Sequence, residues 1–289
     1  MHILKIYVWI IALLLTFSSC GGKKQNEEQR ATLTVSIEPL RFFAEAIAGD
    51  KFSVTSLVPE GSSPETYDPT PQQLIALGKS TAFLRIGYIG YEQVWADKLQ
   101  QNAPNVKFFD MSEGIDLIKE DDTEHHGHVH AGGVEPHIWN SVRNADIIAN
   151  NVYRALCNVD SEHQAYFAQK LDSLKQVIRS TDEQVKAFLL DSQCTFLIYH
   201  PALSYFARDY GLQQICIEKG GKEPSPAHVQ ELIKQCRNER VKVIFIQKEF
   251  DVRNAEMIAK ELGLKVVSIN PLSYHWDKEM INIAEALAR

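Results

Sequence analysis

The fold is decided by residues 161–190, which read SEHQAYFAQKLDSLKQVIRSTDEQVKAFLL. This stretch contains no glycine or proline. A mostly apolar set of its side chains recurs at alternating spacings of four and three residues: Phe167, Leu171, Leu174, Ile178, Thr181, Val185 and Phe188. One stripe with this period predicts a single amphipathic helix, roughly 45 Å long at 1.5 Å per residue. Because that is more than one small lobe requires, we expect the helix to span two lobes; the alternative is a short coiled coil between two chains.

On both sides of this helix, short runs rich in β-branched and aromatic residues alternate with amphipathic segments. The expected strands are residues 32–37, 54–58 and 82–86 before the helix, and 195–199, 241–246 and 265–269 after it. This alternation predicts an α/β fold with two lobes and mainly parallel sheets. We expect an N-terminal lobe over residues 32–158, a linking helix over 159–190 and a C-terminal lobe over 191–289.

The first residues have the order of an export signal. Lys5 precedes an apolar run over residues 6–15, and two serines and Cys20 follow it. The run is about half of the roughly 20 residues that a membrane-spanning helix needs, so residues 1–19 are interpreted as a cleaved signal peptide. Cys20 resembles the lipidated cysteine of bacterial lipoproteins; the alternative is an ordinary secretory signal with an incidental cysteine. Residues 20–31 lack large apolar side chains after Cys20 and are expected to form a flexible tether.

The charge of the chain argues against one class of partner, and its cysteines allow two interpretations. The formal net charge is −7 and the sequence has no basic stripe, so nucleic acid is not an expected partner. Four cysteines besides Cys20 occur at positions outside any CxxC pair: Cys157, Cys194, Cys216 and Cys236. An even number of cysteines in an exported protein permits disulfides, but buried free thiols explain these residues equally well.

Histidine is concentrated in one segment. Four of the ten histidines are His125, His126, His128 and His130, with acidic residues before them and glycines after them. Imidazoles at this density suit zinc, copper or nickel. We therefore interpret residues 121–133 as a surface loop that gathers metal without fixing a rigid geometry; the alternative is a solvated polar loop.

Three further residues stand where a fixed site would form. Glu65 lies in a proline-rich loop after the strand at 54–58, His137 lies between the histidine-rich loop and a helical stretch, and His200 closes the strand at 195–199. In α/β sheets ligands collect where strands end, so the three side chains are expected to face one cleft. Two histidines and a glutamate also suit a zinc hydrolase, although the sequence contains no HExxH motif.

Four motifs around these residues resemble the zinc- and manganese-binding solute-binding proteins of ABC transporters. They are PETYDPTP at 64–71, EPHIW at 135–139, HPALSYFARDYG at 200–211 and EKGGKEPSP at 218–226. The resemblance runs from about Thr32 to the C-terminus, with the motifs in the family's order. It implies two α/β lobes joined by one long helix, with the metal between them, and a protein without enzymatic activity.

The resemblance also implies a ligand set. The family's first ligand, a histidine after proline, falls on Glu65, the second on His137 and the third on His200, where histidine is the choice typical of zinc. The fourth, normally aspartate, falls near Asn270, and water or His275 is an alternative to it. The expected cargo is Zn²⁺, with Mn²⁺ or Fe²⁺ as alternatives, and the histidine-rich insertion also resembles the zinc branch.

The resulting functional hypothesis is an exported, lipid-anchored, monomeric protein. It would capture a divalent transition metal on the periplasmic side and deliver it to an ABC permease in the inner membrane; a location on the outer surface stays open. The alternatives are a zinc hydrolase and a surface lipoprotein that acts as an adhesin.

Overall fold

The computed structural model describes residues 30–119, 133–190, 194–218, 224–247, 250 and 253–288. The expected signal peptide, Cys20, the tether up to residue 29 and the four clustered histidines lie outside these residues.

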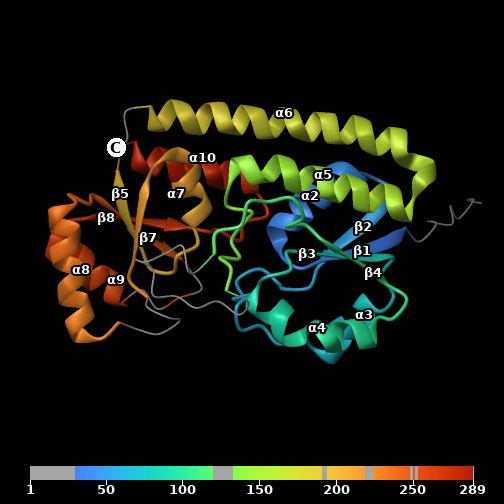
Figure 1. Ribbon diagram of the computed structural model, residues 1–289, viewed down its shortest axis with the longest axis horizontal. Helices are drawn as coiled ribbons and strands as arrows, with labels where there is room; N and C mark the ends of the chain where they lie inside the picture. The colour runs from blue at the N-terminus through green and yellow to red at the C-terminus, as the bar shows by residue number, and fades with distance from the viewer. Residues whose placement is uncertain are drawn as a thin grey trace, which may run out of the picture. The chain divides into compact units, whose positions relative to one another are not determined.

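The N-terminal lobe is built on a four-stranded parallel sheet (Figure 1). Its strands are β1 (Ala31–Val35), β2 (Phe52–Ser56), β3 (Ala82–Arg85) and β4 (Lys107–Asp110), in the order β2-β1-β3-β4. The three strands expected from the sequence are confirmed with small shifts at their ends. β4 was not predicted, because KFFD is a four-residue edge strand with partly exposed side chains and carries no recognisable alternation.

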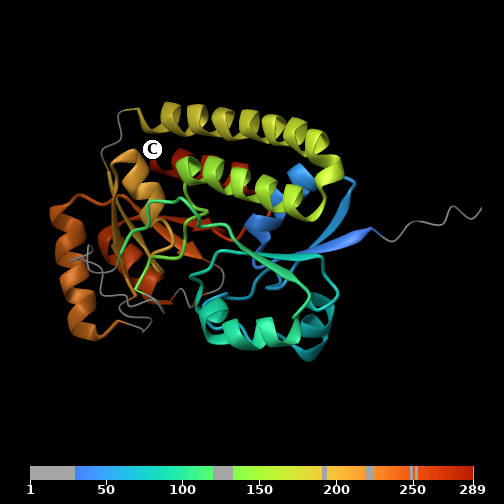
Figure 2. The same cartoon turned by 45° about the vertical axis from the view of Figure 1, so that its right-hand side comes forward.

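Four helices flank this sheet: α2 (Glu38–Ala48), α3 (Pro71–Leu77), α4 (Gly90–Asn102) and α5 (Val142–Val159). α2 and α5 contact the strands, and both views place α3 and α4 on the other side of the sheet (Figures 1 and 2). α3 begins after Thr70, which forms a reciprocal capping box with Gln73 and precedes Pro71 in the first turn. This strong helix start ends the loop that carries Glu65.

The C-terminal lobe repeats the arrangement. Its parallel strands are β5 (Thr195–Ile198), β6 (Gln213–Cys216), β7 (Val243–Gln247) and β8 (Lys265–Ile269), in the order β6-β5-β7-β8. Its helices are α7 (Ser204–Tyr210), α8 (Pro226–Asn238), α9 (Arg253–Leu262) and α10 (Trp276–Leu287). The three predicted strands are again found, and the missed strand is again a short edge strand, QQIC.

The side chains of β5 point alternately into two hydrophobic cores on opposite faces of the sheet. Leu197 belongs to a core shared with α8 and α9, whereas Phe196 and Ile198 belong to a larger core that continues through α10 and α6 into the N-terminal lobe. Successive side chains of a strand point to opposite faces, so this sheet is buried on both sides. The larger core is therefore shared by the two lobes, whereas the smaller core belongs to the C-terminal lobe.

The long helix is α6 (Gln164–Leu189), with 26 residues and a length of about 39 Å. It follows a 3-10 turn, η2 (Ser161–His163). It packs on α2 and α5 at one end and on α10 at the other, and it runs above both lobes in the two views (Figures 1 and 2). The predicted stripe is buried except at its last position, where Leu189 is buried and Phe188 only partly so. The buried stripe continues at Leu189, four residues after Val185, and not at Phe188. Two helical turns take about 7.2 residues, so a strict seven-residue repeat slowly drifts away from the buried face.

The two-lobe α/β prediction with one long helix is confirmed, while the residue numbers proposed for the lobe boundaries stay a prediction. Cys157, Cys194, Cys216 and Cys236 are free thiols. Of the helices within the described ranges, none combines the length and apolar character needed to cross a bilayer.

Candidate metal centre

Glu65 is held by the first turn of α4. The Pro64 carbonyl accepts a hydrogen bond of 3.2 Å from the Tyr91 backbone N–H. Gly90 lies against the glutamate: a Cβ atom at this position would be 2.4 Å from the Glu65 carbonyl oxygen and 3.0 Å from its Oε2. Only glycine permits this approach, which places the carboxylate at the positive end of the α4 dipole.

His137 is oriented by a glutamate two residues before it. The Glu135 carboxylate accepts a hydrogen bond of 3.0 Å from the His137 backbone N–H and also pairs with Nδ1 of the ring. Ser204 donates to the other carboxylate oxygen over 3.1 Å, so Glu135 is fixed from both sides. With Nδ1–H donated to a carboxylate, the neutral ring presents the lone pair of Nε2.

His200 follows β5 and is held in three ways. The Gln247 side chain exchanges two hydrogen bonds with its backbone, of 3.1 Å from His200 N–H and 3.0 Å to its carbonyl. Nδ1 lies 2.7 Å from Glu218 Oε2. The ring stacks on Phe250 with centroids 4.9 Å apart. These contacts leave Nε2 as the atom that faces His137.

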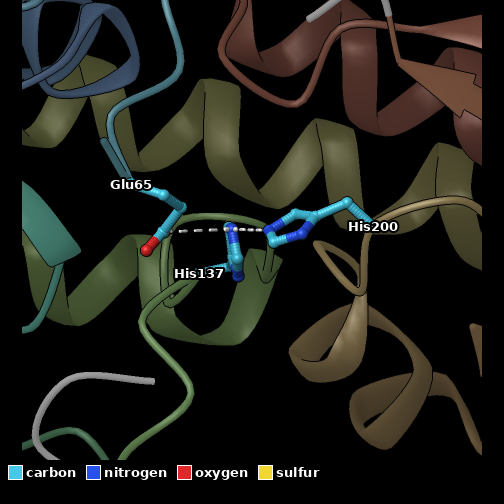
Figure 3. A group of neighbouring side chains, drawn as sticks. All are labelled: Glu65, His137 and His200. Carbon is cyan, nitrogen blue, oxygen red and sulfur yellow. Dashed lines mark hydrogen bonds and ion pairs between the residues drawn. The ribbon is translucent and has the colours of Figure 1, made fainter. Parts of the chain in front are cut away.

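The three predicted side chains converge (Figure 3). The ligand atoms of Glu65, His137 and His200 all lie within 4.8 Å of one another. The two Nε2 atoms are 3.3 Å apart, and His137 Nε2 is 3.9 Å from Glu65 Oε1. Two nitrogens bound tetrahedrally to zinc at 2.0–2.1 Å would be about 3.3–3.4 Å apart. The separation of the imidazoles therefore fits a shared cation.

The electrostatics of the group also favour a cation. Burial, which disfavours the imidazolium, lowers the pKa of His137, but the carboxylates of Glu135, Glu65 and Glu218 outweigh it, so the pKa is raised above its usual value. Three carboxylates around two imidazoles attract positive charge to the Nε2 atoms. A divalent ion satisfies both facing lone pairs at once.

The cavity at this group is small. Its volume is about 20 Å³, and its wall includes Trp139, Pro271 and Leu272 besides the three converging residues. A volume of this size holds one or two water-sized occupants. It suits a single ion.

Neither candidate for a fourth ligand joins the group. The side-chain oxygen of Asn270 accepts a hydrogen bond of 3.1 Å from the Leu272 backbone N–H. His275 is exposed at the start of α10, with its ring against Tyr274. The cavity wall contains the two residues after Asn270 but neither candidate itself. Their role as ligands stays a prediction.

Sequence reasoning missed the residues that orient the ligands. Glu135 and Glu218 lie inside the quoted motifs, and the position of Glu135 two residues before His137 is the signal that could have identified it. No sequence motif identifies Gly90 or Gln247, because each is far in the sequence from the ligand that it contacts and lies beside it only in the folded protein.

Comparison with known proteins agrees with this geometry. The family described as zinc-uptake complex component A, periplasmic (ZnuA), matches residues 33–287. The high-affinity zinc uptake system protein ZnuA of Bacillus subtilis is 25% identical over 284 residues, covering 91% of this chain and 86% of the relative. The iron ABC transporter substrate-binding lipoprotein MtsA of Streptococcus pyogenes serotype M1 is 25% identical over 270 residues, covering 89% and 84%.

A crystal structure of ZnuA has a TM-score of 0.83 and 32% sequence identity, covering 90% of this chain and 98% of that one. These relatives are named as components of zinc uptake systems or of an iron ABC transporter and not as enzymes, so the hydrolase alternative is not favoured. The match over nearly the whole length of both lobes confirms the resemblance found in the four motifs. The chain belongs to the ZnuA family of periplasmic substrate-binding proteins of metal ABC transporters.

Proposed function

We propose that this protein captures a divalent transition metal, zinc foremost, at Glu65, His137 and His200 and passes it to an ABC permease. The observation that carries this proposal is the 3.3 Å separation of two Nε2 atoms whose rings each place Nδ1 on a buried carboxylate. That arrangement supports the proposal, because it orients both imidazoles with Nε2 toward a shared point before a metal arrives.

Zinc is the proposed cargo because two imidazoles and one carboxylate match its preferred donors. The carboxylate at position 65 also suits Mn²⁺ or Fe²⁺, and MtsA, one of the relatives, is named as the substrate-binding lipoprotein of an iron ABC transporter. The second Glu65 oxygen, a water, Asn270 or His275 would complete the coordination. His125, His126, His128 and His130 are proposed to collect additional metal with lower affinity.

For the cellular location we propose export through the signal at residues 1–19 and a lipid anchor on Cys20, facing the periplasm. The name of MtsA as the substrate-binding lipoprotein of an iron ABC transporter supports the anchor. We propose that the protein acts as a monomer, since the three metal ligands all come from one chain.

The test is metal content and affinity of the purified mature chain. Elemental analysis and calorimetric titration are expected to give one tightly bound zinc per chain, without turnover of generic ester or peptide substrates. Deleting residues 125–130 should remove weaker binding but leave the tight site. Hydrolysis that a chelator abolishes, or the absence of tight binding of any divalent transition metal, would refute the proposed function.

Zinc affinity should fall in mildly acidic solution. The metal binds neutral His137, so protons compete with it below the raised pKa of this residue. Because the shift is upward, the loss should begin above pH 6.5 and approach about tenfold per pH unit for one displaced proton. Titrations between pH 5.5 and 8 measure this slope. In Glu135→Gln the decline should begin at lower pH, and an unshifted profile would contradict the assigned cause.

Gly90→Ala should weaken metal binding although position 90 supplies no ligand. The new Cβ would overlap the Glu65 carbonyl and push the loop away from α4. We expect an affinity loss of about tenfold, the scale of losing a residue that orients a ligand. Gly78→Ala, at the end of α3 where the nearest atom to the Cβ is at 3.1 Å, is the control. Equal affinities of both variants would show that the Gly90 contact does not position Glu65.

A further inference from the structure

Two buried tryptophans exchange hydrogen bonds between segments that are far apart in the sequence. Trp139 Nε1 donates to the Pro271 carbonyl over 2.8 Å, and Trp276 Nε1 donates to the Trp139 carbonyl over 2.7 Å. The side chains are 0% and 1% exposed. Residue 139 thus gives one hydrogen bond to the connection between β8 and α10 and receives one from Trp276, the first residue of α10. We call Trp139 and Trp276, with these two hydrogen bonds, the indole clamp.

Neighbouring contacts tie the same connection to the N-terminal lobe. The Tyr274 hydroxyl donates to Glu45 of α2 over 2.6 Å, and the Arg41 guanidinium lies 4.3 Å from the centre of the Tyr274 ring. The Trp276 ring packs against Phe43 of α2, with centroids 5.2 Å apart. The connection from β8 to α10 is therefore held by α2 on one side and by the clamp on the other.

The clamp adjoins the metal centre. Trp139 follows His137 by two residues, and their rings are 5.2 Å apart. Trp139, Pro271 and Leu272 all contribute to the cavity wall. A further buried hydrogen bond of 2.9 Å, from Asn140 Nδ2 to the Ala202 carbonyl, joins the chain just after His137 to the chain just after His200.

Parting these segments would leave buried donors and carbonyls without partners. Two indole N–H groups, one amide N–H and their acceptors would lose hydrogen bonds in an apolar interior, which is costly. A continuous helix such as α6 resists bending, but on its own it does not fix the distance between residues at the far edge of the lobes. The clamp supplies this missing constraint beside the ligands.

We propose that Trp139 and Trp276 are positioning residues that hold His137 opposite His200 before metal arrives, so that metal enters without separation of the lobes at this point. The proposal rests on the proposed function, because it takes His137 and His200 as ligands. It predicts that the metal-free and metal-loaded proteins have the same dimensions as long as the clamp is intact.

The test is Trp276→Phe, which keeps an aromatic ring against Phe43 but removes the N–H that binds the Trp139 carbonyl. We expect zinc affinity to fall about tenfold, equivalent to about 1.4 kcal/mol. Small-angle scattering should show compaction of the variant on zinc loading, and none for the wild type. Tyr274→Phe removes only the hydrogen bond to Glu45. It should lower zinc affinity and cause compaction on zinc loading, both to a smaller extent than Trp276→Phe.

Tyr166→Phe is the matched control, because the Tyr166 hydroxyl also binds a carboxylate, Asp50, over 3.0 Å, but lies away from the metal centre. It should leave affinity and dimensions unchanged. Trp276→Phe that lowers only the unfolding temperature, with wild-type affinity and no compaction, would overturn the clamp. Wild-type protein that binds no metal would instead overturn the proposed function.

Discussion

His200→Ala is expected to lower zinc affinity by more than about 100-fold. The loss of an outer residue that orients a ligand typically costs 10- to 100-fold, and removing the ligand itself costs more. The substitution also leaves Glu218 as a buried carboxylate without the ring that it now contacts at 2.7 Å. His137→Ala should have a similar effect, since its Nε2 faces the same point (Figure 3). Competition titrations against a chelator of known affinity measure the change.

His228→Ala is the matched control. His228 lies in the first turn of α8, and its ring faces Glu231 in the same helix. The control should retain wild-type affinity and stoichiometry. If His200→Ala retained an affinity within a few fold of the wild type, the residue would not be a ligand, and the proposed site would be wrong. Circular dichroism on the metal-free variants separates loss of the ligand from loss of the fold.

Glu218→Gln is expected to lower zinc affinity by about 10- to 100-fold without removing any ligand. Glutamine keeps the size of the side chain and can still accept the Nδ1–H of His200 through its amide oxygen. It removes one of the three carboxylates that offset the charge of the cation. The metal-free variant should be at least as stable as the wild type, because the remaining carboxylates repel each other less.

For Glu218→Gln, zinc affinity is expected to fall while the stability of the metal-free protein does not, and this difference separates two explanations. Damage to the fold would lower both affinity and stability, whereas loss of electrostatic support lowers affinity alone. Glu183→Gln, at an exposed position of α6, controls for the change in net charge. Affinity of Glu218→Gln within twofold of the wild type would mean that hydrogen bonding alone, and not the carboxylate charge, supports His200.

Besides the indole clamp, two features limit the protein to small adjustments on metal binding and oppose a wide hinge motion. α6 packs on helices of both lobes, and the larger hydrophobic core continues from one lobe into the other. A wide opening would expose part of this shared core to water, at about 25 cal/mol for each Å² of apolar surface. Scattering that shows large compaction of the wild-type protein on loading would contradict this expectation and the clamp together.

The long helix and six of the strands could be predicted from the sequence, because each shows a local pattern of residues. The spacing of Phe167, Leu171 and Leu174 continues over many turns, and the predicted strands are runs rich in β-branched and aromatic residues. Of the edge strands, β2 and β8 have five residues and were predicted, whereas β4 and β6 have only four residues and were missed, because so short a segment shows little pattern of its own.

The candidate ligands were also accessible from the sequence. Glu65, His137 and His200 lie in motifs whose order matches the family, and the structure brings the three side chains together. The sequence could not choose the fourth ligand, and the structure places Asn270 and His275 outside the cavity wall.

The sequence by itself determined the two-lobe α/β fold, the linking helix and the donor types of the candidate site. Only the tertiary structure decided how those donors are held. The Gly90 contact with Glu65, the exchange between Gln247 and His200 and the bond from Trp276 to Trp139 join residues that are 25, 47 and 137 positions apart. Local propensity and periodicity act over a few residues, whereas these contacts exist only after both sheets and α6 have packed together.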